Sequence, residues 1–436
     1  MRSRSSVANI LLFLAIIAEN LFLYYAYRQW GMSQSFTAKG LFFSSLAVGL
    51  IPLYKFYKKD IEVSIPRPGR INSISYALLG LFVLALVYFG IQYQAIFRAN
   101  PLGPQYSDII PEIQVACKRF LSGQNVYTPI TDFGYTLELT YLPMQWLPYT
   151  IAELGKFDYR WIAFVIWAVA AILLFVRSMR SGNILHQCLA GILILLGNYV
   201  LFSRNPGIVS STVELMVAGY YILLIIGLNT KNAFVLGITI SLCLLSRFSL
   251  LLWLPLGAFT LYAAKENKRL LWVCITVSIA VLLIYVIPFL SKDWSSFYRG
   301  YKYYDNSALG EWKNLDDKGN PGQVFSGAGF AYIFYYKLPG LPLIDRIKML
   351  QKAHLICSFG VTIIMGIWYW FNRKKIDHRI FLQGSFKIYL TFFLVFIQVP
   401  YEYLMMVGNF VSIAIFCEQL KYRSSPMVAP AREKNQ

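Results

Sequence analysis

The sequence predicts an all-α polytopic membrane protein with about 10–12 transmembrane helices. Of its 436 residues, 57% are hydrophobic, 17% are aromatic and 14% are charged. Soluble domains carry roughly 25% charged residues, so this chain has too little polar surface to cover a water-soluble body of its size. The net charge of +19 comes largely from basic residues beside apolar blocks. That placement indicates membrane topology and no nucleic-acid partner.

A series of apolar blocks, most of them about long enough to cross a bilayer, accounts for this fold class. Backbone polar groups cannot remain unpaired in hydrocarbon, so each block is expected to be helical. The first block is too long for a signal peptide and lacks a convincing cleavage site, so we expect it to be a span. The blocks lie approximately at 8–27, 40–54, 72–96, 157–176, 184–202, 207–229, 233–264, 270–290, 349–371, 381–399 and 402–419.

Lys and Arg residues in the short connections predict the orientation. When the chain is threaded in and out of the membrane, every basic cluster falls on one side, which the positive-inside rule identifies as the cytoplasm. Both termini are therefore expected in the cytoplasm. The clusters are Arg2 and Arg4; Lys55, Lys58, Lys59, Arg67 and Arg70; Arg177 and Arg180; Lys265, Lys268 and Arg269; Arg373, Lys374, Lys375 and Arg379; and Lys421 and Arg423.

Two apolar segments do not fit a simple span. Residues 233–264 are too long for one span and short for two, and either a re-entrant hairpin or two short spans would return the chain to the same side. Arg247 lies in the middle of this segment. A lone Arg at mid-membrane costs about 2.5–3.5 kcal/mol on insertion scales, so we expect it to face a cavity or a partner. Lys387, within 381–399, is expected to snorkel or to mark a later helix start.

Two long outer loops, about 97–156 and 291–348, separate these blocks. Long loops in compact proteins tend to be functional. In the first loop, the recurrence of apolar residues predicts a helix over 109–121 that lies flat on the outer membrane surface, with Glu112 on its polar face. Ser122-Gly123 is a suitable stop for this helix.

Polar residues within the apolar blocks favour their outer halves. Glu214 lies in the outer half of the sixth block, and Gln398 and Glu402 lie at the outer connection of the last pair. This bias predicts a polar cavity that opens outward. The alternative for any single residue is that it only joins neighbouring helices by hydrogen bonds.

Asp108 is the most informative carboxylate. It stands at the end of the third block's outer extension, just before the predicted surface helix. One interpretation is an N-cap, because an Asp before a helix satisfies its free N–H groups. The other is a general base at the membrane surface. The two roles can coexist.

The order of residues around Asp108 resembles a known family. Asp108 is followed by Ser122-Gly123-Gln124-Asn125-Val126-Tyr127, Thr140-Tyr141-Leu142-Pro143 and Trp146-Leu147-Pro148. This order is similar to the first outer loop of GT-C-fold, polyprenyl-phosphate-sugar-dependent glycosyltransferases, in particular a bacterial mannosyltransferase-like branch. The resemblance covers about 100–160 and extends more weakly to the Arg247 hairpin and the topology. Two spans precede the block that leads into this loop, where many relatives have fewer.

The resemblance implies a GT-C-like bundle with short surface helices in the first outer loop and Asp108 as the catalytic base. It also divides the chain into four parts. These are an N-terminal helical hairpin (1–71), a GT-C-like catalytic module that includes the outer loop 97–156 (72–290), the second outer loop (291–348), and C-terminal helices with a basic cytoplasmic tail (349–436).

The family's chemistry fits these residue types. The donor is a sugar on a polyprenyl phosphate, and an acceptor hydroxyl would give its proton to Asp108 as it attacks the anomeric carbon with inversion. The departing phosphate calls for cationic neutralisation, for which Arg247, Arg204 and His354 are candidates. As alternatives, Arg247 pairs with Glu214, Arg204 anchors at the interface, and His354 is satisfied within a helix.

Other residues are candidates for the cavity and the acceptor site. They are Glu214, Tyr141, Gln398, Glu402 and Tyr301. The aromatic residues of the second outer loop suit sugar stacking and equally suit an interfacial aromatic belt. We expect no metal and no other cofactor, because a monophosphate donor lacks the pyrophosphate that commonly recruits a metal ion.

These inferences predict a glycosyltransferase of the bacterial inner membrane whose site faces the periplasm. It would move a hexose, mannose by family resemblance, from a polyprenyl-phosphate donor to a glycolipid or glycan acceptor. The competing predictions are a transporter or flippase of lipid-linked sugars, and a glycan ligase or polymerase with a pyrophosphate-linked donor. Transporters often show two related halves and polar sites near the midplane, whereas a ligase would be expected to rely on a late, basic outer loop.

Overall fold

The computed structural model describes residues 2–26, 34–57, 61–64, 72–204, 206–317, 319–421 and 423–426. It confirms an all-α polytopic membrane protein. Within these residues, seven helices are long and apolar enough to cross a membrane. They are α1 (Arg2–Ala26), α2 (Gln34–Lys55), α3 (Ser73–Ala99), α7 (Arg160–Met179), α8 (Ile184–Arg204), α13 (Asn267–Val281), which a π-helical turn continues, and α16 (Leu343–Asn372).

Shorter helices complete the bundle, and they correspond to the remaining apolar blocks. They are α10 (Glu214–Leu228), α11 (Ala233–Leu244), α12 (Leu254–Ala263), α17 (His378–Val395) and α18 (Glu402–Gln419). Elements outside the bundle are α4 (Ile109–Leu121), α5 (Pro143–Trp146), α6 (Thr150–Gly155), α9 (Pro206–Ser211), α14 (Ser295–Lys313), α15 (Ala331–Tyr336) and the paired strands β1 (Ile61–Ser64) and β2 (Arg423–Pro426).

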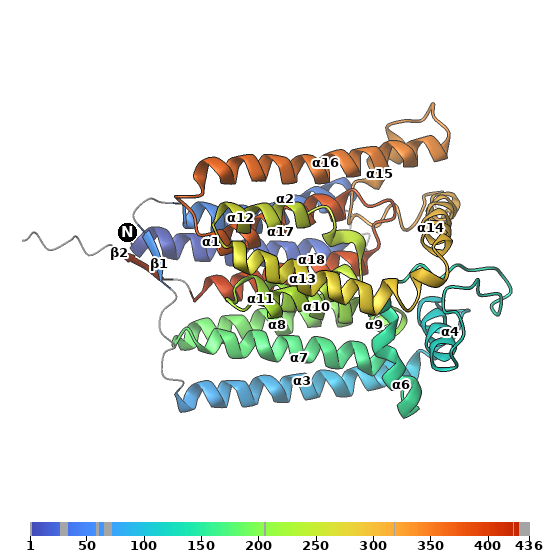
Figure 1. The fold of residues 1–436 in the computed structure, drawn as a ribbon, viewed down its shortest axis with the longest axis horizontal. Helices are drawn as coiled ribbons and strands as arrows, with labels where there is room; N and C mark the ends of the chain where they lie inside the picture. The colour runs from blue at the N-terminus through green and yellow to red at the C-terminus, as the bar shows by residue number, and fades with distance from the viewer. Residues whose placement is uncertain are drawn as a thin grey trace, which may run out of the picture.

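The two ends of the bundle differ in kind (Figure 1). The N-terminus, β1 and β2 lie at one end, whereas α4, α6 and α14 lie at the other, across the ends of the long helices. We call the first the basic end and the second the loop end. At the basic end, Lys375 Nζ donates to Tyr57 Oη at 3.3 Å and Arg177 pairs with Glu418 at 2.8 Å. These contacts place the connection after α16 beside that after α2, and the end of α7 beside that of α18, so the basic clusters at these four positions lie at the basic end.

The centre of the bundle is formed by α10, α17 and α18. Every residue of α18 except Tyr403 is buried, and so is every residue of α10 except Leu223. In contrast, only 6% of the apolar window of α13 and 17% of that of α16 are buried inside the protein. The outer helices therefore offer an apolar face to lipid, while the central helices are enclosed by protein, where their polar side chains are tolerated.

Two glycines allow α2 and α17 to approach closely. A Cβ at Gly49 would lie 3.0 Å from the carbonyl oxygen of Gly384, and a Cβ at Gly384 would lie 2.8 Å from the carbonyl oxygen of Gly49. Small residues at such a contact let two helix backbones pack against each other in a membrane. The N-terminal hairpin is attached to the central helices at this point.

A methyl group at Gly384 is expected to weaken this contact. Gly384→Ala places Cβ 2.7 Å from the Leu53 side chain as well as against the Gly49 backbone, so α2 and α17 must separate. Overpacking of this kind typically costs about 1–3 kcal/mol, which a lowered midpoint of thermal unfolding in detergent would reveal. Gly360→Ala on α16 is the matched control, because nothing lies within 4 Å of its Cβ position. Equal midpoints for the two variants would contradict the proposed close packing.

Residues 233–264 form a hairpin of two half-length helices. At 1.5 Å per residue, α11 and α12 are about 18 Å and 15 Å long, which is less than the roughly 30 Å of bilayer hydrocarbon. Their tip meets the first outer loop, since Met144 N donates to Leu245 O at 2.9 Å. Tyr221 Oη bonds Ser249 Oγ at 2.6 Å, and Tyr389 Oη donates to Ser249 O at 2.7 Å. The hairpin therefore presents Arg247 to the loop end without crossing the membrane as two full spans.

Lys387 neither snorkels nor marks a helix start, so that prediction was wrong. It is 1% exposed in the middle of α17, where Nζ donates to Glu19 Oε1 at 2.7 Å and to Gly408 O at 2.9 Å. Ser412 Oγ donates to the second oxygen of Glu19 at 2.5 Å. The charge remains in the apolar interior because α1 and α18 supply its partners.

The surface helix of the first outer loop has the predicted bounds, and one of its faces was predicted wrongly. α4 runs from Ile109 to Leu121 and ends before Gly123, whose φ of +72° suits glycine. Ile110, Ile113 and Ala116 are buried against the bundle. Glu112, which we expected on the polar face, is 4% exposed, because the next segment of the loop covers it.

Candidate active site

Asp108 occupies the N-cap position of α4 without acting as a cap. Its backbone is already helical, with φ −81° and ψ −17°, and within the described part of the chain its side chain makes no capping hydrogen bond. Instead, Asp108 Oδ2 accepts from Tyr135 Oη at 3.2 Å. The N-cap interpretation is therefore incorrect for this side chain, and the carboxylate is available for other contacts.

Asp108 is held close to the start of α10. Its neighbour Ser107 donates from Oγ to Ser211 O at 3.1 Å. Three residues later, Glu214 begins α10 and pairs with Arg247 at the tip of the α11–α12 hairpin. The short connection between α9 and α10 thus links the segment that carries Asp108 with the ion pair of Arg247.

Tyr141 interacts electrostatically with both Asp108 and Arg247. Burial raises the pKa of Tyr141 well above its ordinary value, the acidic neighbours Glu112 and Asp108 raise it further, and Arg247 lowers it. Arg247 and Asp108 also both interact electrostatically with Tyr403, in the first turn of α18. The structure therefore brings Asp108 and Arg247 to one site, which we call the loop-end cluster: Asp108, Glu112, Tyr135, Tyr141 and Arg247.

Tyr135 serves Asp108 as a hydrogen-bond donor. Burial and the neighbouring Asp108 carboxylate raise the pKa of Tyr135 to about 12. The phenol therefore keeps its proton throughout the neutral pH range and can donate a hydrogen bond to the carboxylate.

The second outer loop also contributes groups that interact with the cluster. Arg299 of α14 pairs with Asp293 at 2.8 Å and with Glu138 of the first loop at 3.5 Å. Farther along α14, Tyr303 interacts electrostatically with Asp108 and Glu112, and Tyr304 interacts with Arg247. The two loops that sequence analysis treated separately thus form a single site.

The connection before α18 binds α14 of the second outer loop through two hydrogen bonds. Trp312 Nε1 donates to Gln398 O at 2.9 Å, and Tyr401 Oη donates to Glu311 Oε1 at 3.0 Å. The rings of Tyr401 and Tyr403 stack with centroids 5.1 Å apart and planes inclined by 11°. Stacked phenols of this kind offer a flat aromatic surface beside the charged groups.

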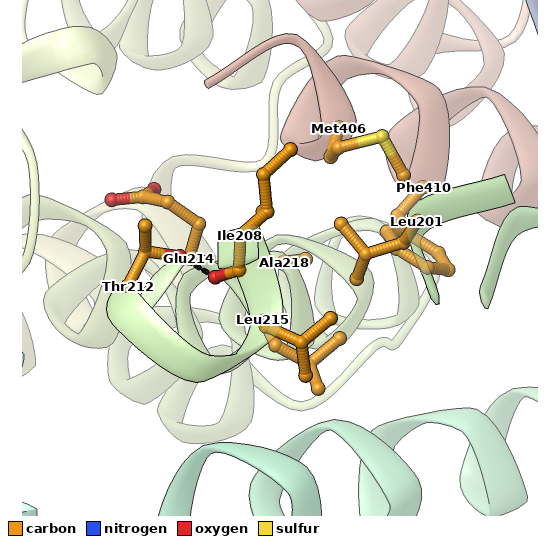
Figure 2. A pocket seen from close by; sticks show the side chains of 9 residues that line it. Leu201, Ile208, Thr212, Glu214, Leu215, Ala218, Met406 and Phe410 are labelled. Carbon is orange, nitrogen blue, oxygen red and sulfur yellow. Dashed lines mark hydrogen bonds between the residues drawn. The ribbon is translucent and has the colours of Figure 1, made fainter. Parts of the chain in front are cut away.

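A small pocket of about 10 Å³ lies beside Glu214 (Figure 2). Its walls come from α8, α9, α10 and α18, and all of its lining residues except Thr212 and Glu214 are apolar. The Glu214 carboxylate lies at one end, away from Leu201 and Phe410. The sequence predicted a polar cavity that opens outward, whereas this pocket is an apolar recess with a charged residue at its margin.

The remaining predicted site residues are distributed around this region. Glu402 is buried at the start of α18, Gln398 is half-buried in the connection before it, and Tyr301 is 58% exposed on α14. His354 lies on α16 with its ring 4.4 Å from that of Phe393, and no contact among the described residues joins it to Asp108 or Arg247. Arg204 ends α8, and its side chain lies outside the described residues.

Sequence reasoning missed several members of the site. Glu112 and Tyr135 were not singled out as site residues, and Tyr303 and Tyr304 were considered only among the aromatic residues suited to sugar stacking. All four interact with Asp108 or Arg247. For Glu112, the signal was its spacing of one helical turn from Asp108, which puts both carboxyl groups on one face. The tyrosines belong to irregular loop or surface-helix segments, and the periodicity of such segments does not predict which residues they contact.

The described residues contain no group of three or more His, Cys, Asp or Glu side chains that could hold a metal ion. The chemistry available in the loop-end cluster is therefore that of a carboxyl pair, phenols and one guanidinium group. Comparison of the chain with protein-family models, with curated proteins and with solved structures found no match.

Proposed function

We propose that this protein is a membrane glycosyltransferase that moves a hexose from a polyprenyl-phosphate donor to a glycolipid or glycan acceptor. Mannose is our first candidate for the hexose. The observation that carries the proposal is the placement of Asp108 near Arg247: Ser107 donates to Ser211 O at 3.1 Å, and Glu214, three residues after Ser211, pairs with Arg247. The bacterial inner membrane, with the loop end facing the periplasm, is the location we propose, because the basic clusters lie at the opposite end.

The two charged groups have complementary roles in this reaction. An acceptor hydroxyl forms a bond to the anomeric carbon while its proton passes to Asp108, and the bond from that carbon to the phosphate oxygen breaks with inversion. Arg247 receives the departing lipid phosphate, because a guanidinium group matches two phosphate oxygens. Atoms balance without a further reactant: the products are the glycosylated acceptor and polyprenyl phosphate, with the proton on Asp108.

Glu214 neutralises Arg247 before the donor binds. The two side chains form an ion pair, in which the Arg247 side chain is 28% exposed and that of Glu214 is 4% exposed. An uncompensated charge at this depth would be costly, so a partner is needed when no phosphate is present. The donor phosphate then binds in competition with Glu214 for the same guanidinium group.

The lipid part of such a donor would lie against the apolar outer faces of the long helices, because the recess beside Glu214 has a volume of only about 10 Å³. The exposed aromatic residues of α14, among them Tyr298 and Tyr301, offer stacking surfaces for sugar rings.

Transfer by the purified protein tests this proposal directly. The protein in lipid nanodiscs is incubated with polyprenyl-phosphate mannose, then with polyprenyl-phosphate glucose, each together with an envelope lipid extract as the source of acceptor. We expect release of polyprenyl phosphate and appearance of a lipid heavier by one hexose. Unchanged donor with every hexose offered, in protein that binds the donor no better than empty nanodiscs do, would contradict the proposal.

Loss of the guanidinium group is expected to weaken donor binding. A hydrogen bond to a charged group is worth about 1.5–3 kcal/mol, so Arg247→Gln should raise the dissociation constant of polyprenyl phosphate about 10- to 100-fold. The dissociation constant of Arg247→Lys should lie between those of the wild type and Arg247→Gln, since an ammonium group keeps the charge but lacks the planar pair of donors. Titration of fluorescent polyprenyl phosphate measures both. Arg98→Gln, an exposed arginine at the loop end of α3, is the control, and an equal loss there would indicate only general attraction of phosphate.

A further inference from the structure

Glu112 is a buried carboxyl group directly beneath Asp108. The two residues are one helical turn apart on α4, and Glu112 N donates to Asp108 O at 2.8 Å within the helix. Only 4% of Glu112 is exposed, and the backbone N–H of Thr140 donates to its carboxyl group. Its Oε1 has no hydrogen-bond partner among the described residues. A polar atom at such a depth without a partner calls for an explanation.

Glu112 belongs to the same cluster as Asp108. Charged and titratable groups face it from three segments: Asp108 from the start of α4, Tyr135 and Tyr141 from the first outer loop, and Tyr303 from α14. Each of these three tyrosines interacts with both carboxyl groups. A change in the charge of Glu112 would therefore be felt throughout the site.

Two ionised carboxylates are not favoured at this spacing. Burial raises the pKa of Glu112 well above its ordinary range, and the negative charge of Asp108 raises it further. Asp108 is more exposed than Glu112, and its carboxylate accepts a hydrogen bond from the Tyr135 hydroxyl. When two carboxyl groups share one site, the less solvated one keeps the proton.

We propose that Glu112 is a positioning residue that remains a neutral carboxylic acid while Asp108 is ionised, so that the pair carries a single negative charge. A neutral Glu112 supplies an O–H donor to the site through the oxygen that has no other partner. It also avoids a second negative charge where an anionic lipid phosphate must enter. The role in transfer rests on the proposed function, whereas the protonation state of the pair does not.

Infrared titration tests the protonation state without any substrate. The purified wild-type protein in nanodiscs should show the carbonyl band of a protonated carboxyl group at neutral pH, and Glu112→Gln should lose it. In Asp108→Asn the like charge is removed, so we expect the Glu112 band to disappear at a lower pH than in the wild type. An unchanged band in Glu112→Gln, or a midpoint unaffected by Asp108→Asn, would overturn the proposal whether or not the protein transfers a hexose.

The pH profile of transfer then tests the positioning role. Glu112→Gln imitates the neutral acid and cannot ionise, so the pH profile of its transfer should lack the alkaline limb. In the wild type this limb should fall about tenfold per pH unit once Glu112 ionises. Loss of transfer at every pH in Glu112→Gln, with an unfolding midpoint equal to that of the wild type, would mean that Glu112 acts as an ionised base. If Glu112→Gln does not fold, the wild-type and Asp108→Asn titrations alone still decide the protonation state.

Discussion

Asparagine at position 108 is expected to lower hexosyl transfer by about 10²- to 10⁴-fold, the range that a positioned general base contributes. Asp108→Asn keeps the size of the side chain and its ability to accept a hydrogen bond from Tyr135. In the wild type, Tyr135 Oη lies 3.2 Å from Asp108 Oδ2. The substitution removes the group that takes the acceptor proton. Asp108 makes no capping hydrogen bond in the described structure. The substitution should therefore leave the stability of α4 unchanged, so that the loss of transfer reflects the lost base.

The measurement is the rate of polyprenyl-phosphate release at saturating donor, accompanied by donor binding and thermal unfolding. Binding and unfolding should remain close to those of the wild type. Asp132→Asn is the matched control, because Asp132 is an exposed carboxylate of the same loop that was not assigned to the cluster. Normal transfer by Asp108→Asn, or an equal loss in Asp132→Asn, would remove Asp108 from the role of base.

Breaking the ion pair between Glu19 and Lys387 is expected to have the largest effect on stability. Both side chains are at least 97% buried, and Nζ lies 2.7 Å from Oε1. Removal of one partner from a buried pair typically costs about 3–5 kcal/mol, since the other charge remains without compensation. Glu19→Gln and Lys387→Met should each lower the free energy of unfolding in mixed micelles by about this amount, because α1 is attached to α17 and α18 through these groups.

A double-mutant cycle separates the pair from its surroundings. The variant with both substitutions should be more stable than the sum of the two single losses predicts, because no uncompensated charge remains. Lys39→Met is the matched control, since Lys39 is an exposed cation on α2. Strictly additive losses, or a loss in Lys39→Met as large as in Lys387→Met, would show that the pair does not hold the N-terminal hairpin in place.

The arrangement of helices could be predicted from the sequence to a large extent. Apolar blocks gave helices because hydrocarbon allows no unpaired backbone groups, and the basic clusters gave the end at which each helix begins or finishes. The periodicity from Ile109 to Phe120 also gave the bounds of α4. These features depend on composition and local spacing, and a single sequence contains both.

Features that depend on tertiary partners could not be predicted. A lysine inside a span is costly without a partner, and the partner of Lys387, Glu19, could not be identified because it is 368 residues away in the sequence. The spacing of Glu112 placed it on the polar face of the helix, but in the structure residues near Thr140 lie against it and bury it. For Asp108, both interpretations used the same residue type at the same position, and only the geometry of the side chain separated them. Arg247 and Glu214 were named as an alternative pairing, and the structure contains that pair.

The fold explains why the proposed chemistry is placed at one end. Arg247 reaches the first outer loop because α11 and α12 are half-length and their tip bonds Met144 through Leu245. Asp108 reaches the same place from α4, which lies across the helix ends (Figure 1). An acidic group at the start of a surface helix and a basic group on a hairpin tip thus lie at the same end of the bundle, where the proposed donor and acceptor would bind.

Mass spectrometry of envelope glycolipids tests the central claim most directly. A strain that lacks this chain is compared with the same strain carrying either the wild-type protein or Asp108→Asn. We predict that one glycolipid or glycan is lighter by a hexose in the deletion strain, that the wild type restores it, and that Asp108→Asn does not. Restoration by Asp108→Asn, or an unchanged set of glycans together with accumulated donor on one side of the membrane, would contradict transfer and favour a flippase.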